Sequence, residues 1–349
     1  MTELESPRNP YSAPAADDPI EISSAECMAR APLVSVLMIT YNHAGYVAES
    51  IRSVIAQACG FPIELIIGED ASTDDTRSIA LDFQKRHPEL IRVVYSRANV
   101  GMIANSRRIF ARARGEFIAY CEGDDYWCSR HKLSLQVEKL RENPRAAVVH
   151  SDWVRSKLDG ETWKVGWNRP VHGRIPLRLL QGEIFATFHY PKILRTCTTL
   201  HRRNSIAEFL ASPLAAKRYR FGDTVRTAYQ TSRWEVAYLP AITAVYRESA
   251  GSALRSGKLA RLSFLLSCLE LDDEARAFFS DRKDYPAGYR WESSVGLLVL
   301  ALLARQYDTA RSALRDIRAH FGLFDFLKTG LQTARMRMPT LFRQRRVVP

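Results

Sequence analysis

The sequence lacks a run of apolar residues long enough to cross a lipid bilayer. Its longest run, from Val295 to Ala304, has ten residues, whereas a membrane-spanning helix needs roughly 17–25. The first residues are polar and acidic without an apolar stretch, so we expect no secretory signal peptide. These absences predict a water-soluble protein in the cytoplasm.

Cysteine is sparse as well. The 349 residues include six cysteines, which form neither a CxxC pair nor, with the histidines, a cluster at zinc-ligand spacing. A disulfide scaffold and a structural zinc site are therefore excluded, and a chain of this length can build its core without either. We interpret the scattered thiols as reduced residues.

Two nucleotide-binding signatures are also missing. No GxGxxG follows the first predicted strand, and no GxxxxGK[ST] occurs anywhere in the chain. Dinucleotide-dependent oxidoreductases and P-loop ATPases are therefore disfavoured. We find no internal repeat either.

Acidic residues are too few to balance the basic ones, and the excess is concentrated near the C-terminus. Lys and Arg number 50 against 38 Asp and Glu, a net charge of +12, of which residues 305–349 supply +7, from ten basic and three acidic side chains. A nucleic-acid groove through the main domain is not indicated. Because bulky apolar residues lie among the cations after Phe321, this tail favours peripheral contact with an anionic membrane, with a solvated basic helix end as the alternative.

What is present is an alternation of apolar strands and amphipathic helices. Strands are predicted at 33–40, 62–68, 91–95, 116–121 and 146–150, with helices between them. This order predicts an α/β fold with a mostly parallel sheet and helices on both faces. We expect a disordered leader over 1–31, a main domain over 32–252 with halves at 32–155 and 156–252, and a helical, basic region over 253–349.

Polar side chains follow each of these strands. In an open α/β sheet, ligands bind beyond the carboxyl ends of the strands. The densest group is Glu122, Asp124 and Asp125, whose like charges repel unless a cation lies among them. Such oxygen ligands suit Mg²⁺ or Mn²⁺, and the alternative is an acidic loop that caps the next helix. We assign capping to the segment Ser72 to Asp75 and leave Asp70 free to accept a hydrogen bond.

Four motifs at these strand ends carry a more specific signal: Ser35 to Asn42, Glu69 to Asp74, Asn99 to Gly101, and Glu122 to Trp127. In order, spacing and placement they resemble the nucleotide-binding half of glycosyltransferase family 2, the inverting enzymes with a GT-A fold. The resemblance covers residues 33–155 and, more weakly, 190–252.

This resemblance implies a nucleotide-diphospho-sugar donor, with UDP- or dTDP-sugars favoured. The residues that it assigns to donor binding are Thr40, Tyr41, Asn42, Asp70, Asn99, Asn105, Glu122, Gly123, Asp124 and Trp127. Asp124 and Glu122 would contact the metal, Mn²⁺ or Mg²⁺, although the family's usual DxD begins with Asp where this chain has Glu122. Trp127 could stack on the sugar, and packing in the core is the alternative.

Asp223 is the predicted catalytic base. The segment around it resembles the one in which the family places an acidic residue at the start of a helix, where Asp is also a common N-cap. Inversion needs a carboxylate that takes the proton of the acceptor hydroxyl. Arg247 resembles a cation near the diphosphate, or it only flanks the sheet.

The predicted protein is thus a metal-dependent inverting glycosyltransferase of bacterial surface-polysaccharide type. Its acceptor would be a sugar or a lipid-linked glycan, and it would work in the cytoplasm at the inner face of the membrane. The alternative is a non-catalytic nucleotide-sugar-binding or scaffold protein that retains the fold. Neither hypothesis involves nucleic acid.

Overall fold

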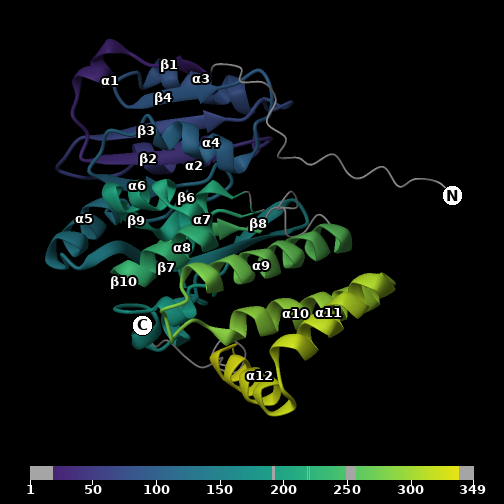
Figure 1. Ribbon diagram of the computed structural model, residues 1–349. Coiled ribbons are helices and arrows are strands. Elements are labelled where there is room, and N and C mark those ends of the chain that lie inside the picture. The colour runs from purple at the N-terminus through teal and green to yellow at the C-terminus, as the bar shows by residue number, and fades with distance from the viewer. Residues whose placement is uncertain (1–18, 191–192, 218, 220, 249–256, 338–349) are drawn as a thin grey trace.

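A computed structural model describes residues 19–190, 193–217, 219, 221–248 and 257–337. Within them, ten strands form one sheet with the order β1-β4-β3-β2-β5-β9-β7-β10-β6, and β8 pairs with β7 outside this path. Helices lie on the faces of the sheet, and four further helices form a separate layer at its C-terminal side (Figure 1).

The elements of the first half are β1 (Ile20–Ile22), α1 (Ala25–Ala29), β2 (Val34–Thr40), α2 (Val47–Ile55), β3 (Ile63–Glu69), α3 (Thr76–Arg86), β4 (Ile91–Tyr95), α4 (Met102–Phe110), β5 (Phe117–Tyr120), β6 (Tyr126–Trp127), α5 (Lys132–Glu142), β7 (Ala146–Asp159) and β8 (Thr162–Val165). Those of the second half are β9 (Leu200–Arg202), α6 (Arg203–Ala211), α7 (Pro213–Ala216), α8 (Asp223–Arg233), β10 (Glu235–Arg247), α9 (Lys258–Phe278), α10 (Ala287–Leu303), α11 (Tyr307–His320) and α12 (Leu323–Arg337). Four short 3₁₀ turns lie between β8 and β9, at His172–Arg174, Leu177–Leu179, Phe185–Thr187 and Thr196–Thr198.

Six strands of the sheet run in the same direction: β2, β3, β4, β5, β7 and β10. Strands β4, β3, β2 and β5 pair in parallel, and β7 pairs in parallel with β10. The short β9 lies antiparallel between β5 and β7 and so joins the two parallel halves. The predicted α/β fold with a mostly parallel sheet is confirmed, and the carboxyl ends of its central strands meet at one edge.

Burial on both faces explains why the parallel strands read as unbroken apolar runs. Alternate residues of β2 enter two different cores: Val36 and Met38 pack on one face of the sheet, and Leu37 packs on the other. Both cores are closed by helices, because the apolar stripe of each helix is buried against the sheet.

The N-terminal segment corrects one expectation. The predicted disordered leader over 1–31 is wrong for residues 20–29, where β1 pairs antiparallel with β4 and α1 follows. Charge anchors this segment, because Glu21 accepts hydrogen bonds from Arg92 (2.8 Å) and Arg112 (3.0 Å). Residues 1–18 lie outside the described part of the chain.

The second half of the chain begins with short 3₁₀ turns and ends in four long helices, α9 to α12. Residues 235–247 form one long strand, β10, whose pairing with β7 is interrupted by bulges near its middle. Helices α9 to α11 surround a buried ion network in which Arg290 contacts Asp272 (3.0 Å) and Asp316. In the described residues no helix is both long and apolar enough to cross a membrane. The predicted helical region is therefore observed for residues 258–337, and its boundary at 252 lies outside the described residues.

Candidate active site

The acidic loop, residues 122–125, lies between β5 and β6 at the carboxyl edge of the sheet. Its glycine is required, because a Cβ on Gly123 would lie 2.5 Å from Thr40 Oγ1 and 2.9 Å from His43 Nδ1. The Gly123 N–H donates to the carbonyl oxygen of Ile39 at 3.0 Å. The loop is therefore pressed against the end of β2, where the predicted donor-binding residue Thr40 is buried.

Arg247, at the end of β10, fixes this loop from the opposite side. Its backbone N–H donates to Asp125 Oδ1 (2.9 Å), and its Nη1 donates to the carbonyl oxygen of Asp124 (3.1 Å). The guanidinium also pairs with Glu49 of α2. Arg247 is only 4% exposed, so it holds the loop from within the protein.

The charges of Asp124, Asp223 and Arg226 all affect the ionisation of Glu122 at this edge of the sheet. Burial, the charge of Asp124 and the charge of Asp223 raise the pKa of Glu122 to about 7, and Arg226 opposes this shift. The effect of Asp223 on the pKa of Glu122 means that the start of α8 faces the acidic loop closely enough for their charges to interact.

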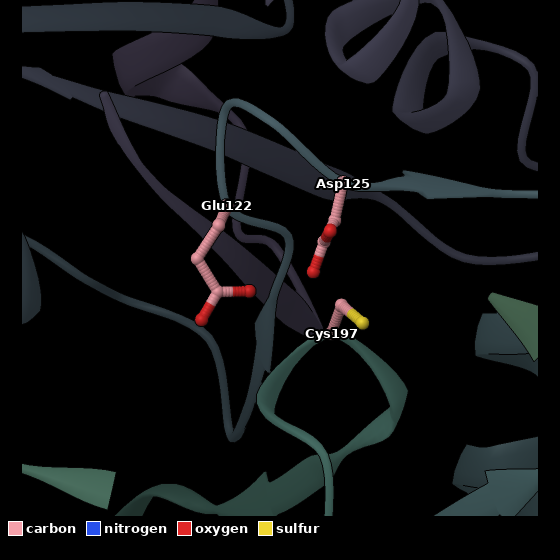
Figure 2. A group of neighbouring side chains, drawn as sticks. All are labelled: Glu122, Asp125 and Cys197. Carbon is pink, nitrogen blue, oxygen red and sulfur yellow. The ribbon is translucent and has the colours of Figure 1, made fainter. Parts of the chain in front are cut away.

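The residues present fit a divalent cation. Glu122 Oε2 is buried without a hydrogen-bond partner among the described residues, and an unpaired buried carboxylate oxygen is costly unless an ion meets it. Ligand atoms of Glu122, Asp125 and Cys197 lie within 4.8 Å of one another (Figure 2). Burial raises the pKa of the Cys197 thiol well above its usual value, so Cys197 stays protonated and hard cations prefer the carboxylates.

Asp223 is not the N-cap of α8. Gly222 occupies the cap position, and Asp223 is the first residue of the helix. Its Oδ1 accepts the N–H of Thr224 at 2.8 Å, which leaves the second carboxylate oxygen for another partner. An acidic side chain at this position is also favoured by the helix dipole.

The predicted base-contacting carboxylate of Asp70 is buried and organises a neighbouring loop. Its Oδ1 and Oδ2 accept the N–H groups of Val100 and Gly101, each at 2.9 Å. The exposed Asn99 donates to the Asp70 carbonyl oxygen at 2.9 Å. Burial raises the pKa of Asp70 despite these bonds and the nearby Arg108. Asp70, which follows β3, and Asn99, on the loop after β4, thus lie side by side.

The loop after β2 is joined to the loop after β3. Asn42, in a left-handed conformation (φ 54°), accepts the N–H of Thr73 at 2.9 Å, and Tyr41 beside it is 43% exposed. The predicted capping role holds for Asp74, which accepts the N–H of Thr76 at 3.0 Å, whereas Asp75 caps nothing with its side chain. Tyr41 is therefore the member of this loop best placed to meet a ligand.

Two predicted donor-binding residues lie in the protein interior. Trp127 is 4% exposed, belongs to the main core, and donates from Nε1 to the carbonyl oxygen of Cys197 at 2.9 Å. Asn105 is buried and donates to the carbonyl oxygen of Gly68 at 2.8 Å. Stacking of Trp127 on a sugar is therefore corrected in favour of packing, because β6 pairs with β10 at the edge of the sheet and the Trp127 side chain packs into the main core. Asn105 ties α4 to β3.

A fully buried lysine lies under Trp127. Lys132 Nζ donates to Gln136 Oε1 at 2.7 Å and lies 4.3 Å from the centroid of the Trp127 ring. No carboxylate pairs with it in the described part of the chain. Burial accordingly lowers the pKa of Lys132 from 10.5 to about 7.

We expect Lys132→Met to stabilise the protein more at pH 6 than at pH 9.5. Because the folded protein holds this proton less tightly than the unfolded chain, stability falls as pH decreases from 10.5 to about 7, and the full cost remains below pH 7. The advantage of methionine should therefore shrink by about 1–3 kcal/mol between the two pH values. Urea unfolding measures it, with the more exposed Lys139→Met as control. Equal advantages at both pH values would mean that Lys132 is solvated.

Sequence reasoning missed Arg226 and Cys197. Arg226 lies 4.4 Å from the centroid of the Tyr120 ring, one helical turn after Asp223, and this spacing was the available signal. For Cys197, 72 residues beyond Asp125, the chain offers no local signal. The sequence shows Asp125 as part of the acidic loop, but it gives no sign that the Asp125 carboxylate accepts a hydrogen bond from Arg247.

Comparisons with known proteins match this geometry. Residues 35–196 match the family model described as glycosyl transferase family 2. The chain is 37% identical to an uncharacterized protein of Mycobacterium tuberculosis over 142 residues, which are 40% of this chain and 41% of that protein. It is 37% identical over 111 residues to TuaG of Bacillus subtilis, a glycosyltransferase named for teichuronic acid biosynthesis, covering 32% and 43% of the two chains. The match thus spans about two fifths of these relatives.

Two solved structures share the fold at low sequence identity. TarS of Staphylococcus aureus in complex with UDP-GlcNAc aligns with a TM-score of 0.50 and 15% identity, over 82% of this chain and 91% of that chain. A mannosyltransferase of Pyrobaculum calidifontis in complex with GDP-Man and Mn²⁺ aligns with a TM-score of 0.50 and 18% identity, over 91% and 87%.

Proposed function

We propose that this protein is a metal-dependent inverting glycosyltransferase, because residues 35–196 match the model of glycosyl transferase family 2 and the fold is shared with TarS. It moves a sugar from a nucleotide-diphospho-sugar, with UDP- or dTDP-sugars favoured, to a hydroxyl group of an acceptor. The observation that carries the proposal is the acidic loop, where ligand atoms of Glu122, Asp125 and Cys197 lie within 4.8 Å of one another and Glu122 Oε2 is buried without a hydrogen-bond partner among the described residues.

Glu122 and Asp124 are the residues proposed to hold the cation, Mn²⁺ or Mg²⁺. When bound, the ion would neutralise the diphosphate leaving group. The orphaned Glu122 Oε2 supports this assignment, as does the raised pKa of Glu122, because like charges that lack a counterion favour protonation.

Asp223 is the proposed base for the acceptor hydroxyl. Its second carboxylate oxygen is free of the Thr224 bond, and it lies on α8, an element separate from the acidic loop. A carboxylate on a separate element suits inversion, in which the proton leaves on the face opposite the diphosphate. Arg226, one turn along the same helix, adds a positive charge near the phosphates.

Thr40, Tyr41, Asn42, Asp70 and Asn99 form the proposed nucleoside end of the donor site. They occupy the loops after β2, β3 and β4, which are joined by the bonds of Asn42 and Asp70. In this proposal the exposed Tyr41 flanks the base, and the lone pairs of Asp70 that remain accept from it.

The acceptor is proposed to be a sugar or a lipid-linked glycan of bacterial surface-polysaccharide synthesis, at the inner face of the cytoplasmic membrane. Support comes from the relative TuaG, named for teichuronic acid biosynthesis. The bound donors of the two solved structures, UDP-GlcNAc and GDP-Man, support a nucleotide-sugar partner.

A donor-hydrolysis screen tests the proposal without knowledge of the acceptor. We expect slow release of the nucleoside diphosphate from one UDP- or dTDP-sugar, dependent on Mn²⁺ or Mg²⁺ and absent with a chelator. Calorimetry of UDP, dTDP and GDP in the presence of Mn²⁺ provides the control for binding. Binding without hydrolysis of any donor would favour the non-catalytic alternative, and the absence of binding would overturn both.

A further inference from the structure

Helix α12 buries mostly small and polar side chains and exposes large apolar ones, whereas an ordinary surface helix buries its apolar face. Its inner side is made of small or polar residues: Thr329 and Thr333 are buried, and Gly330 approaches the Trp291 ring of α10 so closely that a Cβ would lie 2.8 Å from it. Phe326 also contacts Trp291, with ring centroids 5.5 Å apart. The helix is therefore seated on α10 through a narrow contact strip.

The outer face of α12 carries its large apolar side chains. Leu323 is 80% exposed, Phe324 76%, Leu327 56% and Leu331 62%. They recur at helical spacing, so they form one continuous stripe. Apolar stripes on surface helices normally face the core, and a contiguous exposed one marks an interaction surface. Figure 1 shows α12 at the margin of the helical layer, on the side away from the sheet, where nothing in the described chain covers this face.

The charge of this part of the chain indicates which partner binds the exposed face. Lys328 lies on the helix among the leucines, and the sequence from Leu323 to Pro349 has six Lys and Arg against one acidic residue, Asp325. Two copies of the chain that paired through this face would bring two strongly basic segments together. An anionic lipid surface would attract them instead, by roughly 1 kcal/mol for each cation near the surface.

We propose that the outer face of α12 is a membrane-binding surface that inserts Leu323, Phe324, Leu327 and Leu331 among the acyl chains of an anionic leaflet. Amphipathic helices with flanking cations bind bilayers in this way, parallel to the surface. The inference deepens the proposed function, on which its purpose rests, because it brings the catalytic domain to a lipid-linked acceptor. The binding itself requires neither donor nor metal.

Vesicle sedimentation with the full chain tests the surface. We expect the protein to sediment with vesicles of phosphatidylcholine containing 30% phosphatidylglycerol, and to stay in solution with pure phosphatidylcholine vesicles. The double variant L327Q/L331Q should lose roughly tenfold or more in partitioning, because two leucines no longer leave water. The matched control is L158Q/L177Q, which changes two leucines of similar exposure, 53% and 55%, elsewhere in the chain, and should bind like the wild type.

Two results would overturn the proposal. One is equal vesicle binding by L327Q/L331Q and the wild type, which would assign any binding to other parts of the chain. The other is a wild-type dimer, measured by light scattering without vesicles, that L327Q/L331Q converts to a monomer; the face would then be a contact between copies. Thermal melts of both double variants establish that they are folded. Donor hydrolysis is assayed without lipid, so the two proposals can fail separately. Failure of this inference would leave donor hydrolysis by the wild type intact, and failure of the proposed function would leave its vesicle binding intact.

Discussion

Asp124→Asn should reduce sugar transfer by roughly 1,000-fold while the protein remains folded. The proposed ion loses a charged ligand, and metal stabilisation of a leaving diphosphate is worth several kcal/mol. The loop should keep its shape, because Arg247 contacts the backbone carbonyl oxygen of Asp124 and the side chain of Asp125 instead. Initial rates of nucleotide release at several Mn²⁺ concentrations measure the effect.

A matched variant separates loss of the metal ligand from a general loss of acidic charge. Asp82→Asn removes the same charge from α3, where its exposed side chain pairs only with Arg86 in the described structure, and it should leave the rate unchanged. Asp124→Asn should also weaken Mn²⁺ binding measured by calorimetry. Full activity of Asp124→Asn with unchanged Mn²⁺ affinity would remove Asp124 from the proposed metal site.

Asp223→Asn should lower kcat by about 100- to 10,000-fold, the usual contribution of a general base, and leave the donor dissociation constant within a few-fold of the wild type. Asparagine keeps the Oδ1 atom that accepts the Thr224 N–H, so the start of α8 should remain intact. The loss appears in kcat because the acceptor proton has no recipient, whereas the donor site lies on other loops.

Thr224→Ala is the control for Asp223. It changes the next residue, whose backbone N–H still reaches Asp223, and it should retain most of the wild-type kcat. A normal kcat for Asp223→Asn would show that another group takes the proton.

The order of elements from β2 to α5 could be predicted from the sequence for a physical reason. Each parallel strand is buried on both faces, so its residues form a short apolar run such as Val34 to Met38, and each helix shows a stripe against the sheet. The placement of Asp70 and the acidic loop followed, because carboxyl ends of parallel strands share one edge. Local patterns were sufficient there.

Long-range contacts set the limit of prediction elsewhere. Trp127 resembled a ligand-binding aromatic because it follows acidic residues, and only its pairing with Ala244 of β10 places it in the core. The segment between β8 and β9 folds into 3₁₀ turns that leave no period in the sequence. Residues 20–22 look like part of a polar leader because their strand is short and its side chains are mostly exposed.

The dependence of the acidic loop on Arg247 has a consequence for biosynthesis. As the polypeptide emerges from the ribosome, the loop exists for more than a hundred residues of elongation before the guanidinium and the N–H that hold it have been made. β10 also supplies the antiparallel neighbour of β6 beside that loop. A nascent chain that has released only its first half therefore presents the carboxylates without the groups that hold them in place, and the acidic loop reaches its final form late in translation.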